Sequence, residues 1–384
     1  MAFSFSVIKK DSTSKARLGR LVTAHGVVET PAFMPVGTHG SVKAMAPREL
    51  KEIGCQIVLA NTYHLYLRPG VEIIRELGGL HSFMAWDGPI LTDSGGYQVF
   101  SLGALRKITE EGVSFQSHLD GSRHLLSPEN VVGIQEALGS DIAMVLDECI
   151  PHDAAKEYVR TSTARTVRWA ERSLRARRRE DQALFGIVQG GMHEDLRVKC
   201  AQEMLSLPWD GLAVGGLGVG EDEAAFNSIG EFTAGLLPEE RPRYLMGIGR
   251  PEDIVFAVGC GYDLFDCVLP TRNARNGTLF TSQGKLNIKR SEYSGDPRPV
   301  DELCGCYCCR NFSRAYLRHL YQAGEILAAQ LQTMHNLYFY HRLLESLREA
   351  VRAGNFQEKY SELRSESAPR PRAGAMTIIW KDHP

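Results

Sequence analysis

The chain has 384 residues, of which 43% are hydrophobic and 23% charged, and its formal net charge is −2. This composition is typical of a globular protein and gives no overall signal for nucleic-acid binding. Residues 1–6 lack a basic segment followed by an apolar one, so we expect no secretory signal. No apolar run reaches the ~18 residues that a membrane span needs, and the nine cysteines are clustered rather than evenly spaced, so we expect a cytoplasmic protein without membrane contact.

Short apolar runs that end in polar or glycine-rich segments recur along the chain and predict buried parallel strands. They lie at residues 57–60, 89–91, 142–146, 184–188, 212–214 and 244–246, and in the run that Pro270 closes. Helical patterns separate the later runs, at residues 155–179, 194–206, 221–236 and 251–259. Such alternation over roughly 250 residues predicts an α/β fold of the TIM (β/α)8 barrel type. A doubly wound open sheet is the alternative, but no G-x-G-x-x-G opens an early helix.

Polar residues follow these strands in order along the chain. Asn61, Asp93, Asp147 and Gln189 each come directly after a predicted strand, and glycines follow the next two. In a TIM barrel the active site gathers at the C-terminal ends of the strands. A purely structural barrel does not require polar residues at that end in strand after strand, so the pattern favours an enzyme.

The segment 263–277 holds Asp266 inside an apolar, strand-like run that Pro270 ends. Arg272 and Arg275 follow in a predicted loop that closes on Gly277. An ionised carboxylate is costly in such a run unless it is paired or used chemically. Beside two guanidiniums it suits attack on an electrophilic carbon near phosphates. The alternative is a buried Asp–Arg ion pair with a structural role.

Four of the nine cysteines lie within six residues after the last predicted strand. Structural zinc is held by four tetrahedral Cys or His ligands, and this spacing favours a metal over disulfides. A C-x-C-x-x-C arrangement uses Cys304, Cys306 and Cys309 and leaves Cys308 free. Core cysteines or a redox pair are the alternatives.

The fourth zinc ligand would come from a helix downstream of the cysteines. His335 is the preferred residue, and His319 and His341 are rivals that spacing alone does not exclude. A site closed by four protein ligands stabilises a fold, so we assign this zinc ion no chemistry. The expected division of the chain is a barrel with N-terminal strands (1–284), a zinc-binding subdomain (285–340), and a C-terminal helix closing on the barrel with a polar tail (341–384).

Local charge departs from the near-neutral average around the cysteines. Six basic side chains there could line a groove for phosphates: Lys285, Lys289, Arg290, Arg310, Arg314 and Arg318. A second basic run, at residues 175–179, is better explained as a solvated helix C-terminus that the helix dipole favours. Charge alone gives RNA binding little support.

These motifs together resemble those of the bacterial-type tRNA-guanine transglycosylases, the queuine tRNA-ribosyltransferase family, over nearly the whole chain. The resemblance is carried by Asn61-Thr-Tyr-His64, Thr92-Asp-Ser-Gly-Gly-Tyr-Gln98, Leu146-Asp-Glu-Cys149, Gly186-Ile-Val-Gln-Gly-Gly191, Val214-Gly-Gly-Leu217, Leu245-Met-Gly247, Phe265-Asp-Cys-Val-Leu-Pro-Thr-Arg272 and the Cys304–His335 set. The family implies a TIM barrel with one structural zinc ion per subunit. It also implies exchange of guanine at the anticodon wobble position (position 34) of tRNA for a 7-deazaguanine in queuosine biosynthesis.

The resemblance implies roles for the residues at the strand ends. Asp266 would attack C1′ of the ribose and hold tRNA as a covalent ribosyl intermediate. Asp93 would act as general acid and base and contact the substrate. Asp147 would accept the N1–H and 2-amino donors of guanine. The further substrate-binding residues would be Gln189, Gly216 and Leu217 at the edge of the base and Tyr97 and Met246 on its faces, with Glu221 steadying the Leu217 peptide.

The resemblance also implies how tRNA and the incoming base are recognised. A tRNA with a GUN anticodon would flip its guanine into the pocket. Its anticodon loop would be read by Arg272 and Arg275 and by the segments from Gly247 to Tyr262 and from Thr271 to Arg275. Cys149 and Val219 stand where eukaryotic relatives usually carry Val and Gly, which favours 7-aminomethyl-7-deazaguanine over the bulkier queuine.

Relatives form homodimers, and Tyr63, His64 and the aromatic segment 337–341 are candidate interface residues. Two other protein classes compete with a transglycosylase. A zinc-dependent barrel hydrolase would need His-x-His at an early strand end, a pattern that none of the 12 histidines forms. A non-catalytic tRNA-binding subunit would be expected to lose the nucleophile or the base-reading residues. Archaeal relatives carry additional C-terminal RNA-binding domains, which we do not expect here.

Overall fold

The computed structural model describes residues 3–101 and 106–365. Its centre is a closed barrel of eight parallel strands: β4 (Ala32–Gly37), β5 (Val58–Ala60), β6 (Ile90–Thr92), β10 (Ile142–Met144), β11 (Ala183–Val188), β12 (Gly211–Val214), β13 (Arg243–Leu245) and β14 (Leu264–Cys267). Each strand pairs with the next one in the barrel. The last strand, β14, pairs with the first, β4, which in turn pairs with β5, so the ring is closed. The predicted TIM barrel is confirmed.

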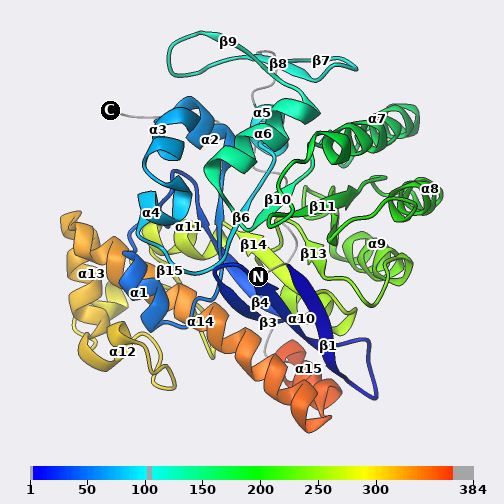
Figure 1. Cartoon of the computed structure of the whole chain (residues 1–384). Helices are drawn as coiled ribbons and strands as arrows, with labels where there is room; N and C mark the ends of the chain where they lie inside the picture. Colours follow the sequence, from blue (N-terminus) through cyan, green and yellow to red (C-terminus); the bar gives the residue numbers. More distant parts are fainter. Residues whose placement is uncertain (1–2, 102–105, 366–384) are drawn as a thin grey trace.

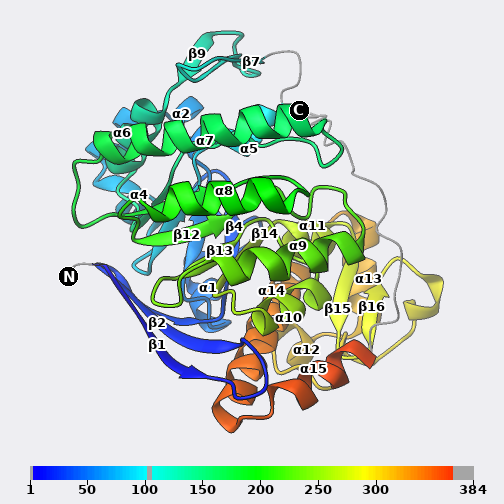
Figure 2. The same cartoon turned by 90° about the vertical axis from the view of Figure 1, so that its right-hand side faces the viewer.

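Helices surround this barrel (Figure 1). They are α1 (Pro47–Glu52), α2 (Thr62–Leu67), α3 (Val71–Glu76), α4 (Gly79–Met84), α5 (Gly96–Phe100), α6 (Pro128–Leu138), α7 (Lys156–Ala176), α8 (Glu194–Leu205), α9 (Glu223–Leu236), α10 (Pro251–Gly259), α11 (Leu269–Arg275), α12 (Tyr307–Asn311), α13 (Arg314–Ala323), α14 (Ile326–Ala353) and α15 (Phe356–Ser365). In Figure 2, α7, α8 and α9 lie in successive layers over one side of the barrel, as consecutive crossover helices do.

Start signals in the sequence explain where several of these helices begin. The hydroxyl of Ser127 accepts a hydrogen bond from the Asn130 amide at the start of α6. The Asp222 carboxylate caps α9 in the same way through the Ala225 amide. Such caps satisfy amides that a helix leaves without internal partners. The four helices predicted between the later strands are present, with ends that agree to within three residues, and α10 has the predicted bounds.

The eighth strand, β4, was not identified from the sequence. All six of its residues are buried, and Pro35 pairs with Cys267 of β14 in the barrel ladder. Proline lacks an amide hydrogen, so its presence in a run normally argues against a central strand. Pro35 therefore argued against a strand at 32–37, although β4 is a central strand of the barrel.

One local prediction was wrong: Arg272 and Arg275 lie on helix α11 and not in a loop. Pro270 falls in the first turn of this helix, where its fixed φ angle is favourable and its missing amide hydrogen costs nothing. Proline therefore starts the helix here instead of merely ending the strand before it. Gly277, with φ of +76°, follows the helix and turns the chain into the next strand.

Three small antiparallel sheets flank the barrel. They are β1 (Ser4–Lys10) with β2 (Arg17–Thr23) and β3 (Gly26–Thr30); β7 (Arg106–Ile108) with β8 (Val113–Gln116) and β9 (Arg123–Leu126); and β15 (Thr278–Thr281) with β16 (Gly284–Asn287). The sheet of β7–β9 lies at one extreme of the molecule, beyond α5 and α6 (Figures 1 and 2).

A second, smaller core lies beside the barrel, and three of its members are Cys306, Cys308 and Cys309. The long helix α14 runs from this core along the barrel (Figure 1). Its Tyr340 donates a hydrogen bond to the Gly249 carbonyl of the barrel. The expected boundary at 284/285 falls within the β15–β16 hairpin and the one at 340/341 within α14. The division into 1–284, 285–340 and 341–384 therefore remains a proposal.

The predicted polar tail begins at Ser365, and all of its residues after Ser365 lie outside the described residues. In the part of the chain that the structure describes, no helix has both the length and the apolar character needed to cross a membrane.

Candidate active site

Asp93 directly follows β6, and four donors hold its carboxylate. Its Oδ1 accepts hydrogen bonds from the amides of Thr62 (2.8 Å) and Gly95 (3.2 Å). Its Oδ2 accepts from the side-chain amides of Gln98 (2.9 Å) and Asn61. These donors fix the carboxylate in place.

Asp266 lies in β14, and its Oδ1 accepts from the Tyr244 hydroxyl (2.6 Å) and the Gly247 amide (2.7 Å). The structural alternative, a buried Asp–Arg pair, is found three residues earlier instead. Asp263 pairs with Arg17 through two contacts, of 2.6 and 3.1 Å, and both side chains are nearly inaccessible. Asp266 is thus left with neutral donors and no guanidinium partner among the described residues.

Burial raises the pKa of both carboxyl groups above the ordinary aspartate range. The pKa of Asp93 reaches about 6, because burial and the negative charge of Asp266 outweigh its hydrogen bonds. Burial likewise raises the pKa of Asp266, and the bonds from Tyr244 and Gly247 limit the rise. Two carboxyl groups that sense each other, one of them titrating near neutrality, suit acid–base and nucleophilic chemistry.

A third carboxyl group, Asp147, follows β10 and is buried. Its Oδ2 accepts from the side-chain amide of Gln189, which follows β11, at 2.7 Å. Burial raises the pKa of Asp147 to about 6, and the neighbouring Glu148 adds to the rise. The Oε1 atom of Gln189 is also buried and has no partner among the described residues. Together these groups leave polar capacity that a hydrogen-bonding ligand could satisfy.

Glycines allow the strand-end loops to approach these side chains closely. A Cβ atom at Gly96 would lie 3.1 Å from Asp147 Oδ1 and 2.9 Å from its carbonyl oxygen. A Cβ atom at Gly216 would lie 2.7 Å from Gln189 Oε1, and the φ of +71° at that position also requires glycine. Side chains at either position would displace the polar groups, so the Gly-Gly pairs of the sequence are explained by packing around them.

The loop after β12 is held from two sides. The buried Arg197 of α8 donates to the carbonyls of Gly191 (2.9 Å) and Gly215 (3.1 Å), which joins the loops after β11 and β12. The Glu221 carboxylate accepts from three successive backbone amides, those of Gly218, Val219 and Gly220. The Glu221 contacts fix the backbone directly after Leu217, and the Leu217 side chain is itself buried.

Tyr97 and Met246 lie at the same end of the barrel, Tyr97 on α5 after β6 and Met246 in the turn after β13. The Tyr97 side chain is half-exposed, and its partial burial raises the pKa of the phenol, a rise that the charge of Arg272 opposes. Arg272 and Arg275 lie one helical turn apart on α11, which follows the strand of Asp266. Neither guanidinium forms an ion pair within the described residues. Cations without a carboxylate partner, on the helix that directly follows the strand of Asp266, are suited to binding a phosphate backbone.

The predicted cysteine cluster is confirmed as a group that could hold a metal ion. The ligand atoms of Cys304, Cys306, Cys309 and His335 all lie within 4.8 Å of one another. His335 turns Nδ1 toward the three sulfurs, at 3.3 to 3.6 Å, and donates from Nε2 to the Phe280 carbonyl at 2.7 Å. A carbonyl that fixes the tautomer of a histidine ligand is typical of metal sites.

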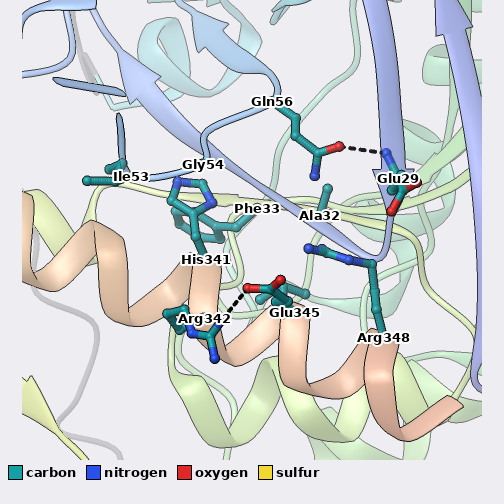
Figure 3. Close-up of a pocket in the computed structure, with 11 residues that line it drawn as sticks. Glu29, Ala32, Phe33, Ile53, Gly54, Gln56, His341, Arg342, Glu345 and Arg348 are labelled. Atoms are coloured by element: carbon teal, nitrogen blue, oxygen red, sulfur yellow. Dashed lines mark hydrogen bonds and ion pairs between the residues drawn. The ribbon is translucent and has the colours of Figure 1, made fainter. Parts of the chain in front are cut away.

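The rival ligands lie elsewhere. His319 is exposed on α13. His341 lines a separate cavity of about 230 Å³ between α14, the end of β3 and the segment after α1, together with Arg348 and Gln56 (Figure 3). Cys308 is buried in the smaller core and is not part of the four-residue cluster.

Burial contradicts part of the expected dimer interface. Tyr63 and His64 are buried beside the barrel, and Leu337 and Tyr340 are fully buried in α14. The Tyr63 hydroxyl contacts His118 of the segment after β8, at 2.9 Å. These residues therefore belong to the protein core.

Each of the two basic runs contains an arginine that pairs with an aspartate. α7 ends at Ala176, inside the run 175–179, and Arg177 pairs with Asp210, so the helix-terminus explanation holds. Near the cysteines, Arg314 pairs with the buried Asp296. A phosphate groove formed by that second group stays a prediction.

Three residues that support the site were not singled out from the sequence as functional. Tyr244 and Arg197 are buried polar side chains, and Gln98 holds Asp93. A tyrosine within an apolar strand was a usable signal, because buried hydroxyls need partners. Arg197 gave none, since helix α8 carries several charges and only the fold shows which of them points inward.

A barrel with three buried or partly buried carboxyl groups at its strand ends, two of them with a pKa of about 6, is typical of TIM-barrel enzymes, whose active sites lie at that end. A family model described as Queuine tRNA-ribosyltransferase matches residues 11–369. The chain belongs to this family.

Curated relatives agree with the family match along nearly their whole length. The Queuine tRNA-ribosyltransferase of Thermoanaerobacter pseudethanolicus is 58% identical over 358 residues, which cover 93% of this chain and 96% of the relative. That of Caldanaerobacter subterraneus is 57% identical over 366 residues, with 95% and 96% covered. That of Solidesulfovibrio magneticus is 58% identical over 350 residues, with 91% and 94% covered.

Proposed function

We propose that this chain is a tRNA-guanine transglycosylase that replaces guanine at position 34 of tRNA with 7-aminomethyl-7-deazaguanine. The single observation that carries the proposal is the pair Asp93 and Asp266, two electrostatically coupled carboxyl groups at the strand ends of a family-matched barrel. The reaction exchanges one N-glycosidic bond for another, so it needs no redox cofactor and no external energy source. We place the enzyme in the cytoplasm, where tRNA is modified.

The proposed chemistry is a double displacement. The Asp266 carboxylate forms a bond to ribose C1′ while the bond from C1′ to the guanine nitrogen breaks. Asp93, in its acid form, gives its proton to the leaving guanine, and then takes one from the incoming base. A pKa of about 6 supports both tasks, because neither protonation state is strongly disfavoured near neutral pH. Two inversions at C1′ retain the β configuration.

Base recognition is assigned to the neighbouring strand ends. The Asp147 carboxylate would accept the N1–H and 2-amino donors, and Gln189 with the Gly216 amide would bind O6. The 2.7 Å contact between Asp147 and Gln189 supports this, since it places donor and acceptor side by side as a guanine edge requires. The Leu217 carbonyl would accept from the 7-substituent, and Tyr97 and Met246 would cover the ring faces.

The choice of base rests on two side chains near this pocket. Cys149 is buried directly after Glu148, and Val219 is partly exposed on the loop that Glu221 holds. A branched side chain at Val219 leaves less room for the cyclopentenediol of queuine than for an aminomethyl group. When both bases compete for the same tRNA, queuine should lose clearly, and Val219→Gly should narrow the gap. Equal use of both bases by the unmodified protein would refute the size argument.

Recognition of tRNA is assigned to α11 and the segment from Gly247 to Tyr262. The unpaired Arg272 and Arg275 could bind anticodon-loop phosphates of a tRNA with a GUN anticodon. Guanine must leave the base stack to meet Asp266, as bases do in other enzymes that act on nucleic-acid bases. A positive cluster directly after the strand of the nucleophile is suited to hold such an opened loop.

The metal is proposed to be one structural zinc ion per subunit. Three thiols and one imidazole form the ligand set that zinc prefers in closed tetrahedral sites. Zinc here would join α12 to α14 and so stabilise the smaller core. It would take no part in the reaction.

A homodimer remains part of the proposal, with a different surface from the one first expected. Five large apolar side chains are exposed around the cysteine cluster: Leu303, Tyr307, Tyr316, Ile326 and Leu327. Phe312 stacks on Tyr316 with ring centroids 5.6 Å apart, which gives part of this surface a fixed shape. Exposed apolar patches of this kind mark protein–protein interfaces.

The direct test is incubation of unmodified tRNA with labelled guanine. A transglycosylase incorporates the label without net reaction, and the label should be found at position 34. A barrel hydrolase would release guanine and leave an abasic site, and a non-catalytic tRNA-binding subunit would do neither. Either of those outcomes would exclude the proposed function.

A further inference from the structure

A second group of metal-binding side chains lies at the other end of the barrel. His25, His81 and Asp141 each offer one ligand atom, and these atoms lie within 4.8 Å of one another. Asp141 directly precedes β10, and its Oδ2 accepts from the amide of Ile90, the first residue of β6, at 2.8 Å. The group therefore lies at the N-terminal ends of the two strands whose other ends carry the base-exchange site.

The three side chains come from three separate elements. His25 is at the tip of the two-residue turn between β2 and β3, and its Nδ1 lies 2.8 Å from Asp141 Oδ1. His81 belongs to α4, and its Nε2 lies 3.1 Å from Asp141 Oδ2. The imidazole rings stack with centroids 3.5 Å apart and an interplanar angle of 17°. Both rings thus present one nitrogen to the same carboxylate.

The carboxylate is held in advance of any ligand. Asp141 is 1% exposed at its side chain, and its backbone bonds Ile90 and Ala183 at the start of both neighbouring strands. In metal sites, groups outside the ligand set orient the ligands, and these backbone groups orient the Asp141 carboxylate in the same way. On the other side, the His25 side chain is 38% exposed, so the group opens to solvent there.

The chemistry of the three side chains selects a class of ligand. A divalent ion would attract the carboxylate and both neutral imidazoles. With bonds of about 2.0–2.2 Å, its neighbouring ligand atoms lie roughly 3 to 3.5 Å apart, so the present contacts of 2.8 and 3.1 Å would need to lengthen only slightly to admit an ion.

We propose that His25, His81 and Asp141 form a second site for a divalent transition-metal ion such as Zn²⁺ or Ni²⁺. Imidazole and carboxylate ligands suit these borderline ions, and water fills the remaining positions on the exposed side. The ion joins the tip of the β2–β3 turn to α4 and to the base of the barrel. With three protein ligands and an open side, the site exchanges its metal more readily than the cysteine cluster does.

The test measures metal binding by the full-length protein, independently of the base-exchange reaction. The protein is first loaded with one zinc ion per chain at the cysteine cluster and dialysed, and Ni²⁺ is then titrated by calorimetry. We expect one further ion per chain. His25→Gln and His81→Gln should each weaken its binding at least about tenfold, as loss of a ligand or its support does.

His152→Gln is the matched control, because His152 is an exposed histidine outside the group. This variant should bind Ni²⁺ as tightly as the unmodified protein does. Added Ni²⁺ should raise the melting temperature of the unmodified protein and of His152→Gln, but not of His25→Gln. His25 lies in a surface turn, so its variant keeps the fold, and guanine exchange should be unchanged. If no second ion binds, or if His25→Gln binds it as tightly as the control, the group is only a hydrogen-bonded triad and the proposal is wrong.

Discussion

At the scale of single residues, the site contains carboxyl groups in surroundings that do not favour their ionised forms. Asp147 shows this most simply, because it has one side-chain donor, Gln189, and almost no contact with solvent. Its pKa of about 6 means that ionisation is costly in the folded protein. A ligand that brings two further donors would relieve that cost, which is how a purine edge could be selected.

The first prediction concerns the stability effect of Asp147→Asn. The folded state binds the Asp147 proton more tightly than the unfolded state does, so ionisation of Asp147 lowers the free energy of unfolding. This loss is absent below about pH 4 and fully present above about pH 6. Asparagine does not ionise and escapes this loss. The variant should gain up to about 3 kcal/mol relative to the unmodified protein between pH 4 and pH 8. Urea unfolding at both pH values measures this, with the exposed Asp153→Asn as a control that should show no such trend.

The second prediction concerns Tyr244, which donates to Asp266 at 2.6 Å. Tyr244→Phe removes a hydrogen bond to an ionised group, worth about 1.5–3 kcal/mol, so the pKa of Asp266 should rise by about one unit or more. The acidic limb of the kcat/KM profile for guanine exchange should move to higher pH by the same amount. Tyr262→Phe, which loses a buried bond to the Gly230 carbonyl far from Asp266, should lower stability without moving the profile. Identical profiles for both variants would exclude the proposed role of Tyr244.

At the scale of elements, the barrel fixes which strand ends meet, and side chains from the helices fix the loops between them. Arg197 of α8 is the main example, since its guanidinium bonds carbonyls after two different strands. Burial lowers the pKa of this arginine to about 10, which still leaves it charged near neutral pH. The cost of burying it is offset by the carbonyls that it satisfies.

The third prediction is that Arg197→Lys loosens the two loops together. An ammonium group cannot reach both carbonyls, so the free energy of unfolding should fall by about 2–4 kcal/mol. Because Gln189 and Gly216 lie on these loops, KM for the incoming base should rise. Lys199→Ala, on an exposed part of the same helix, should change stability by less than about 0.5 kcal/mol. A rise in KM for Lys199→Ala as large as for Arg197→Lys would contradict this explanation.

Periodicity and strand-end chemistry were enough to predict seven strands, the barrel and the carboxylates Asp93, Asp147 and Asp266. What they could not supply depends on contacts between distant segments. Two prolines led to wrong predictions. Pro35 lies inside a central strand that was not predicted, and Pro270 lies in the first turn of a helix where a loop was predicted. Each is tolerated for a reason that only the neighbouring elements reveal.

At the scale of the whole molecule, α14 connects the Cys304–His335 cluster to the candidate active site. His335 contacts the sulfurs on one side of this helix and the Phe280 carbonyl on the other. The next residue, Asn336, donates to the carbonyl of Pro270 in α11 at 3.0 Å. The position of α11, which bears Arg272, therefore depends on whether the cysteine cluster holds His335 and α14 in place.

The fourth prediction is that metal loss weakens tRNA binding. Cys309→Ser should lose the ion, lower the melting temperature and weaken tRNA binding, because α14 no longer positions α11. Cys308→Ser should keep one ion per chain, since Cys308 is outside the cluster. Elemental analysis and a tRNA filter-binding titration measure both effects. Full occupancy in Cys309→Ser, with loss of the ion in Cys308→Ser, would show that the ligand set is wrong.

The central claim is that Asp266 forms a covalent bond to tRNA, and a denaturing gel tests it most directly. The unmodified protein, mixed in stoichiometric amount with unmodified tRNA in the absence of any incoming base and with released guanine removed, should give a band that resists denaturant and disappears when guanine is added. Asp266→Asn should fold, as judged by its melting temperature, and give no such band, while Asp93→Asn should still bind tRNA without turnover. A denaturant-resistant adduct of normal yield in Asp266→Asn would contradict the assignment of the nucleophile.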